Sequence, residues 1–245
     1  MTDYTVVAED HDHVRLLTLN RPDKLNAFTA GGYRALRDRL DAAAADPSIT
    51  ACVMTGAGRA FSAGVDLTEM GRPGGATELG AGFDPLLTAL ATFPKPLIAA
   101  VNGLAVGVGA TILLHCDLVV IDETATVRLP FVALGTCAEA ASSWLLPHRV
   151  GLQQASWLVL SAEPIDADTA VANGFAFSKA GAGEALDAAL ALARRIAVHP
   201  LPALLANKQL LRHGRATAIE EVWRREKAAM QASTEQLGPI GWERG

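Results

Sequence analysis

Short apolar runs that alternate with longer helical patterns constrain the fold of this chain more than any other feature. Residues 49–56 (ITACVMTG), 97–101 (LIAAV) and 118–123 (LVVIDE) are compact runs of this kind, and helical patterns follow them. A strand that is apolar on both faces is typical of a parallel sheet with helices on both sides. The sequence therefore predicts an α/β fold with largely parallel strands.

The two ends of the chain are predicted to depart from this alternation. Residues 5–20 contain two strand-like runs around a polar stretch, which is typical of a hairpin. Residues 201–214 and 217–237 have amphipathic helical patterns with no strand after them. No linker divides the chain, so we expect one domain, with a core over residues 1–195 and a C-terminal helical extension over residues 196–245.

Local signals predict where two helical segments begin or end. Thr29 is a candidate N-cap for a helix that ends before Pro47. Asp66 and Glu69 have the spacing of a capping box, with the aspartate at the N-cap. Residues 71–82 are rich in Gly, Pro and Ala, and we expect this segment to be mobile.

Composition and charge limit the classes of partner. Half of the 245 residues are hydrophobic, which predicts a globular chain. The formal net charge is -5 and no run of Lys and Arg forms a stripe, so we expect no nucleic-acid partner. Polar residues interrupt the longest apolar stretch, around residues 97–120, and predict that it does not span a membrane. Three well-separated cysteines and the absence of a signal-peptide pattern favour reduced thiols and a cytoplasmic location.

Two glycine-bearing loops are the clearest candidates for chemistry. Residues 60–67 (AFSAGVDL) and 102–110 (NGLAVGVGA) each follow a predicted strand and open a helix. Backbone N–H groups at a helix N-terminus lack partners, and two that converge can form an oxyanion hole. Taken alone, each loop is explained as simply by a turn, and neither has the spacing of a Rossmann or P-loop motif.

Three motifs, in order, resemble the crotonase (enoyl-CoA hydratase/isomerase) superfamily. Residues 19–27 (LNRPDKLNA) are similar to its first CoA-contacting loop, and residues 61–67 (FSAGVDL) to its central thioester loop. Residues 94–117, from PKP through NG to CD, are similar to its long core signature. The resemblance implies a crotonase-like spiral of ββα units with a C-terminal helical region, assembled as a homotrimer or as a hexamer built from two trimers. It also implies an acyl-CoA thioester as substrate, with no metal and no redox cofactor.

The resemblance further implies which residues hold the substrate. The backbone N–H groups of Ala63 and Val108 would polarise the thioester carbonyl and hold an enolate. Val108 stands where the family usually has glycine, and its β-branched side chain disfavours a positive φ. The residues implied to bind CoA and the thioester are Lys24, Leu25, Ala27, Ser62, Gly64, Asp66 and Gly107. For Asp66, a purely structural role as a helix cap is an alternative.

Two departures from the family pattern argue against hydratase activity. The positions of the two hydratase glutamates are occupied by Thr111 and Phe131. Hydration needs one group to activate water and another to deliver a proton, and these side chains supply neither.

One carboxylate remains in the right neighbourhood. Residues 134–144 resemble the catalytic segment of peroxisomal-type Δ3,Δ2-enoyl-CoA isomerases, in which a glutamate at the position of Glu139 shuttles the proton. The family's proline before this glutamate is Ala138 here. A single carboxylate can perform a 1,3-proton shift, and apolar neighbours would raise its pKa toward neutrality. The alternative is a solvated glutamate stabilised by a helix N-terminus.

Several alternatives remain open at this stage. The scaffold could perform other enolate chemistry, such as decarboxylation, or bind acyl-CoA without catalysis. His115 is predicted to be a core or interface residue and Cys137 an apolar group lining the pocket. Arg149 is expected to make structural contacts or to meet a neighbouring subunit, and Lys208 to be a solvated lysine or a ligand of a CoA phosphate.

Overall fold

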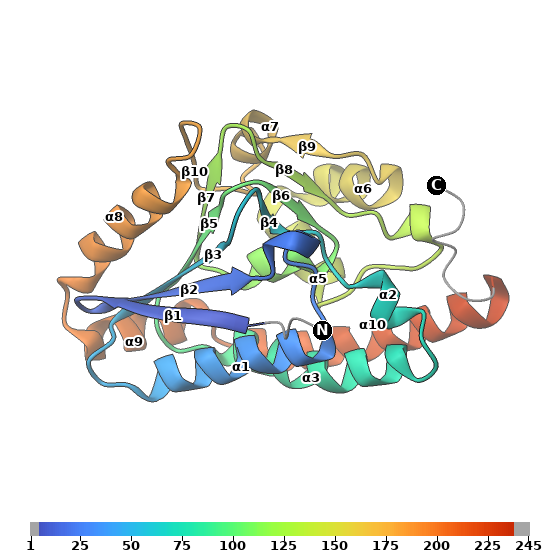
Figure 1. Cartoon of the computed structure of the whole chain (residues 1–245), viewed down its shortest axis with the longest axis horizontal. Helices are drawn as coiled ribbons and strands as arrows, with labels where there is room; N and C mark the ends of the chain where they lie inside the picture. The colour runs from blue at the N-terminus through green and yellow to red at the C-terminus, as the bar shows by residue number, and fades with distance from the viewer. Residues whose placement is uncertain (1–4, 238–245) are drawn as a thin grey trace.

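A large, mostly parallel sheet forms the centre of the molecule (Figure 1). The computed structural model describes residues 5–237. Within them the sheet has the strand order β1-β2-β3-β5-β7-β10. Only the β1–β2 pair is antiparallel, which confirms both the predicted hairpin and the predicted parallel alternation. The strands are β1 (Thr5–His11), β2 (Val14–Asn20), β3 (Ala51–Gly56), β5 (Leu97–Val101), β7 (Leu118–Asp122) and β10 (Ser178–Ala180).

A smaller second sheet lies beside the first. Its order is β4-β6-β8-β9, and its strands are β4 (Ala60–Ser62), β6 (Leu104–Val106), β8 (Thr126–Arg128) and β9 (Ile165–Asp166). Strands β4, β6 and β8 each follow a strand of the large sheet after a short turn, so the chain winds as a spiral of ββα units. This confirms the predicted crotonase-like α/β fold. Strands β4 and β6 lie in segments that the sequence predicts as loop and turn.

Helices cover both faces of the large sheet. Helix α8 packs on one face, and α1 and α3 pack on the other (Figure 1). Most of the buried apolar residues lie on the α1 and α3 side. The α-helices are α1 (Ala30–Ala45), α2 (Leu67–Met70), α3 (Gly75–Thr92), α4 (Val108–Thr111), α5 (Ser142–Val150), α6 (Leu152–Ser161), α7 (Ala167–Ala172), α8 (Ala185–Ala197), α9 (Leu201–Leu211) and α10 (Arg215–Leu237). Three 3₁₀ helices are η1 (Pro22–Lys24), η2 (Ile112–His115) and η3 (Val132–Leu134).

The predicted boundaries of α1 are confirmed. The Thr29 hydroxyl accepts a hydrogen bond of 3.0 Å from the Gly32 N–H, which satisfies one of the free donors of the first turn. The helix ends at Ala45, two residues before Pro47.

The prediction that residues 71–82 are mobile is wrong for most of the segment. Helix α3 begins at Gly75 and is continuous through these residues. A Cβ atom on Gly82 would lie 2.9 Å from the carbonyl oxygen of Ala30. The glycine therefore allows α3 to approach α1 closely, and the contact supports a helix that composition alone disfavours.

The C-terminal helices return to the body of the molecule. Helix α10 packs against α3 and α5, and Figure 1 shows it following the layer formed by α1 and α3. The division into a core over residues 1–195 and an extension over residues 196–245 stays a prediction. Across residues 5–237, no single helix combines the length and apolar character needed to cross a membrane; α8 and α9 do so only as a pair that is bent by 108°.

Candidate functional site

The two glycine loops lie against each other at the ends of neighbouring parallel strands. Strand β4 pairs with β6, and the loops continue from their ends. A Cβ atom on Gly64 would lie 2.7 Å from the carbonyl oxygen of Val106, and one on Gly109 would lie 2.5 Å from that of Ser62. The backbones can approach so closely only because both positions are glycine.

Hydrogen bonds to residues 25 and 26 hold the first loop in place, which corrects one prediction. Ser62 is fully buried; its hydroxyl donates to the carbonyl of Asn26 at 2.9 Å and accepts from the Gly64 N–H at 3.2 Å. The Ala63 N–H donates to the carbonyl of Leu25 at 2.9 Å. The Ser62 side chain therefore links two loops, and its contact with CoA stays a prediction. Ala63 does not offer a free oxyanion donor, because its N–H is already bonded.

Two other backbone donors remain free at this junction. The N–H groups of Val65 and Val108 find no acceptor among residues 5–237. Val108 is the first residue of α4, and the positive φ of 53° falls on Gly107 before it. The β-branched side chain of Val108 therefore does not have to adopt a left-handed conformation. Two unbonded N–H groups on loops in close contact are compatible with an oxyanion hole.

The loop predicted to contact CoA is shaped by Asn26, whose role the sequence did not reveal. Leu25 and Asn26 both have left-handed backbones, with φ values of 51° and 57°. The buried Asn26 side chain accepts from the Arg21 N–H at 2.8 Å and donates to the carbonyls of Ala57 and Ala60, each at 2.9 Å. Lys24 is exposed on this loop and Ala27 is buried.

Asp66 caps helix α2, as its structural alternative predicted. One carboxylate oxygen accepts from the N–H groups of Thr68 and Glu69, and the other pairs with the Arg21 guanidinium at 2.6 Å. Although burial acts in the opposite direction, these hydrogen bonds hold the pKa of Asp66 below its usual value. In a complete capping box, the Glu69 carboxylate would accept from the N–H of Asp66. That part of the prediction is wrong, because Glu69 accepts from the Ala30 N–H at 2.9 Å.

Glu139 lies in the connection between η3 and α5. The residue is half-buried. Removal of its carboxyl from water, together with the nearby Glu226, raises its pKa to about 7. The two residues that follow, Ala140 and Ala141, have φ values of 58° and 59°. Successive left-handed residues other than glycine are costly, and such strain is often found at functional sites.

A second buried carboxylate reaches this segment from the C-terminal helix. Glu226 of α10 is only 5% exposed, and its two oxygens accept from the N–H groups of Ala141 at 2.7 Å and Ser143 at 2.9 Å. Burial raises its pKa, and these hydrogen bonds act against the rise. Sequence analysis missed Glu226, since it lies 85 positions from Ala141 on a largely polar helix.

A cavity of about 480 Å³ opens between the segment around Glu139 and helix α10. Cys137 is half-buried in its wall. The cavity is lined by Cys137, Ala138, Ser143, Trp144, Val222, Arg225, Glu226 and Ala229. Another cavity, of about 520 Å³, lies between the end of α3, α9 and the start of α10, and it shares no lining residue with the first.

Neither position of the hydratase glutamates carries a carboxylate. Thr111 is fully buried and its hydroxyl donates to the carbonyl of Val108 at 3.4 Å. Phe131 is 4% exposed and belongs to the main apolar core.

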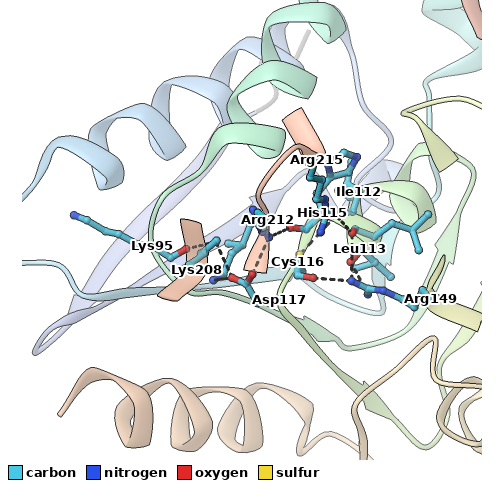
Figure 2. Close-up of polar contacts among 12 residues, drawn as sticks. Lys95, Ile112, Leu113, His115, Cys116, Asp117, Arg149, Lys208, Arg212 and Arg215 are labelled. Carbon is cyan, nitrogen blue, oxygen red and sulfur yellow. Dashed lines mark hydrogen bonds and ion pairs between the residues drawn. The ribbon is translucent and has the colours of Figure 1, made fainter. Parts of the chain in front are cut away.

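His115 and Arg149 make structural contacts at and around η2 (Figure 2). His115 is fully buried, its Nε2 contacts the carbonyl of Ala140 at 2.9 Å, and burial lowers its pKa to about 3. The prediction of a core histidine is confirmed. Arg149 donates to the carbonyls of Leu113, Leu114 and Cys116. Its guanidinium therefore stabilises the C-terminal end of η2.

Both alternatives for Lys208 are wrong. The residue is 7% exposed; its ammonium group donates to the carbonyl of Lys95 and pairs with the Asp117 carboxylate at 2.7 Å. Figure 2 shows Lys208 and Arg212 converging on Asp117. The lysine is neither solvated nor free to bind a phosphate, because both contacts lie inside the protein.

Comparison with known proteins identifies the family. A family model described as Enoyl-CoA hydratase/isomerase matches residues 9–238. The chain belongs to this family.

Named members of the family are similar over most of this chain. The 2,3-dehydroadipyl-CoA hydratase of Escherichia coli is 40% identical over 215 residues, which are 88% of this chain and 84% of the relative. The 1,2-epoxyphenylacetyl-CoA isomerase of the same organism is 34% identical over 213 residues, 84% of this chain and 81% of the relative. An enoyl-CoA hydratase/isomerase structure from Pseudoalteromonas atlantica superposes with a TM-score of 0.87 at 31% identity, and the match covers 94% and 91% of the two chains.

Proposed function

We propose that this enzyme moves the double bond of a 3-enoyl-CoA to give the 2-enoyl-CoA, with Glu139 as the single acid/base. The observation that carries the proposal is one carboxyl group whose pKa of about 7 suits both proton uptake and proton return. Thr111 and Phe131 supply no second carboxylate for hydration. The resemblance of residues 134–144 to peroxisomal-type isomerases gives independent support.

The reaction can be written as two proton transfers. The Glu139 carboxylate takes a proton from C2, and the C–H electron pair becomes part of a dienolate whose charge rests on the thioester oxygen. The free N–H groups of Val65 and Val108 support a hydrogen-bonded site for that oxygen. Protonated Glu139 then returns the proton at C4, so that the C3–C4 double bond becomes C2–C3 and the carboxylate is regenerated.

The remaining features of the proposal concern ligands and assembly. CoA enters as part of the substrate, beside the loop that holds Lys24, and the chemistry requires no metal and no redox cofactor. A homotrimer or hexamer in the cytoplasm is part of the proposal. Exposed apolar side chains on α6, namely Leu152, Trp157 and Leu160, support the existence of a subunit interface.

The decisive experiment compares wild type with Glu139→Gln on a 3-enoyl-CoA. We expect kcat of the variant to fall by about 100-fold or more with CoA-thioester binding retained. In wild type, kcat/KM should rise with pH through about 7, because only the ionised carboxylate accepts a proton. Glu163→Gln, at an exposed position, serves as the matched control.

Two results would contradict the proposal. Hydration of a 2-enoyl-CoA that exceeds isomerisation would restore the hydratase alternative, which the 40% identical relative represents. Bound thioester without turnover in wild type would leave decarboxylation, another enolate reaction or a binding role.

A further inference from the structure

Helix α10 holds the segment around Glu139 on both sides. After the glutamate, the N–H groups of Ala141 and Ser143 donate to the two oxygens of the Glu226 side chain. Before it, the Cys137 thiol lies 3.7 Å from the backbone carbonyl oxygen of the same residue, Glu226. One residue of the C-terminal helix therefore contacts positions on either side of the proposed acid/base.

The segment needs such support because its own residues supply little. Ala140 and Ala141 adopt left-handed conformations without the freedom of glycine, which is unfavourable for a residue with a Cβ atom. Ala141 is also the N-cap of α5, and it has no side-chain oxygen that could bond the free N–H groups of the first turn. The carboxylate of Glu226 takes over that role with charge-assisted hydrogen bonds.

Other contacts restrain parts of the turn, but none of them carries charge. The Ser142 N–H donates to the carbonyl of Glu139 at 2.8 Å, and His115 contacts the carbonyl of Ala140. His115 is neutral, because burial lowers its pKa to about 3. Among residues 5–237, Glu226 is thus the charged side chain that hydrogen-bonds to this turn.

We propose that Glu226 is a positioning residue for Glu139: it holds the left-handed turn that aims the Glu139 side chain and keeps a negative charge beside it. This inference deepens the proposed function and rests on it.

The charge has a consequence for the pH range of the enzyme. A like charge disfavours ionisation, so Glu226 contributes to the raised pKa of Glu139, after the larger effect of burial. The titratable groups around Glu226 are Cys137 and Glu139 of the facing segment and Arg225 of its own helix. Asp84 of α3 contacts other residues of α10, Trp223 and Lys227.

Three variants separate charge from geometry. Glu226→Gln removes the charge and one of the two acceptors. Glu226→Asp keeps the charge on a side chain one methylene shorter. Glu220→Gln, exposed on the same helix, is the matched control.

The first measurement is the pH profile of isomerase turnover. For Glu226→Gln we expect kcat about tenfold lower with KM within about twofold, and the acidic limb of kcat/KM displaced to lower pH. Glu226→Asp should lower kcat with the acidic limb close to that of wild type. If Glu226 had only a structural role, its replacement would lower the free energy of unfolding but leave the acidic limb of kcat/KM at the same pH. That result in both variants would overturn the proposal.

A second measurement does not depend on activity. Carbon-13 NMR of glutamate-labelled protein follows the titration of the Glu139 carboxyl, which is assigned from its absence in Glu139→Gln. In Glu226→Gln, the Glu139 carboxyl should titrate at lower pH than in wild type. An unchanged titration midpoint would overturn the inference even if the isomerase assay detects no turnover. If Glu226→Gln does not fold, the test rests on Glu226→Asp. A kcat equal to that of wild type in this variant would contradict the positioning role.

Discussion

The environment of Glu139 destabilises the folded protein at the pH where the group would work. Its pKa is about 7 in the folded state and 4.5 when the carboxyl is unperturbed. Below pH 4.5 both states hold the proton, and the burial has no ionisation cost. Between 4.5 and 7 the unfolded state releases the proton first, so stability falls as the pH rises, and above 7 the whole cost is present.

Replacement of Glu139 by glutamine should therefore stabilise the protein in a pH-dependent way. We expect Glu139→Gln to match wild type at pH 4 and to exceed its free energy of unfolding at pH 8 by on the order of 1–3 kcal/mol. Urea unfolding of both proteins at the two pH values measures this difference. An equal difference at both pH values would show that the carboxyl is solvated in the folded state.

At the scale of single residues, the sequence predicted which loops are important but not which of their N–H groups are already hydrogen-bonded. The motif at residues 61–67 predicted a free N–H at Ala63, yet that group is bonded to Leu25, and the N–H of Val65 has no acceptor among residues 5–237. Which N–H is free depends on contact with a loop far away in the chain. The sequence likewise did not reveal that the Ser62 hydroxyl donates to the carbonyl of Asn26.

At the scale of elements, the two glycine loops behave as one unit. Their strands β4 and β6 are only three residues long, which is too short to produce a recognisable alternation in the sequence. Longer elements such as α1 and β3 were predicted well, since their pattern extends over several turns or residues. Helix α3 was predicted too short because Gly82, which composition counts against a helix, allows close contact with α1.

Gly109→Ala should separate the two loops. A methyl group there would lie 2.5 Å from the Ser62 carbonyl oxygen, a backbone atom that cannot move alone. We expect a loss of about 1–3 kcal/mol in the free energy of unfolding and a larger relative loss of turnover, because the donors at Val65 and Val108 would move apart. Thermal unfolding and the isomerase assay test the two parts.

Gly80→Ala is the matched control in helix α3. No atom lies within 4 Å of the added methyl group, and the position is exposed. Stability should rise by about 0.5–1 kcal/mol, with activity unchanged. If Gly109→Ala behaved in the same way, the close contact of the loops would not limit either property.

At the scale of the whole molecule, Asp117 joins the C-terminal helices to the large sheet. Its carboxylate accepts from the Leu97 N–H of β5 at 2.7 Å and pairs with Lys208 and Arg212 at 2.7 and 2.8 Å. Asp117→Asn would leave two largely buried cations without their anion. We expect a loss of about 3 kcal/mol in urea unfolding, measured at pH 7.

An exposed ion pair provides the comparison for this prediction. Asp168 pairs with Lys179, and its side chain is 78% exposed. Asp168→Asn should change stability by less than about 1 kcal/mol, because exposed pairs contribute little. Equal effects of the two substitutions would mean that the Asp117 network contributes no more than a surface contact.

The parallel sheet and the two C-terminal helices could be predicted from periodicity, but the docking of α10 could not. Its contact with residues 137–143 depends on a single buried glutamate in a largely polar helix, and local pattern carries no sign of the partner. Lys208 was misjudged in the same way, since only the fold brings Asp117 to it.

Because Glu226 follows the other described elements of the site in the sequence, it is synthesised after them, and this affects the order in which the protein folds. A ribosome releases the sheet, both glycine loops and Glu139 before it releases α10, and N-terminal parts fold first. Until residue 226 emerges, the left-handed pair Ala140–Ala141 lacks its anionic partner. A nascent chain should thus bury most of its core before the turn after Glu139 is fixed, and a chain that terminates before residue 219 would lack this contact as well as the core residues Ile219 and Val222.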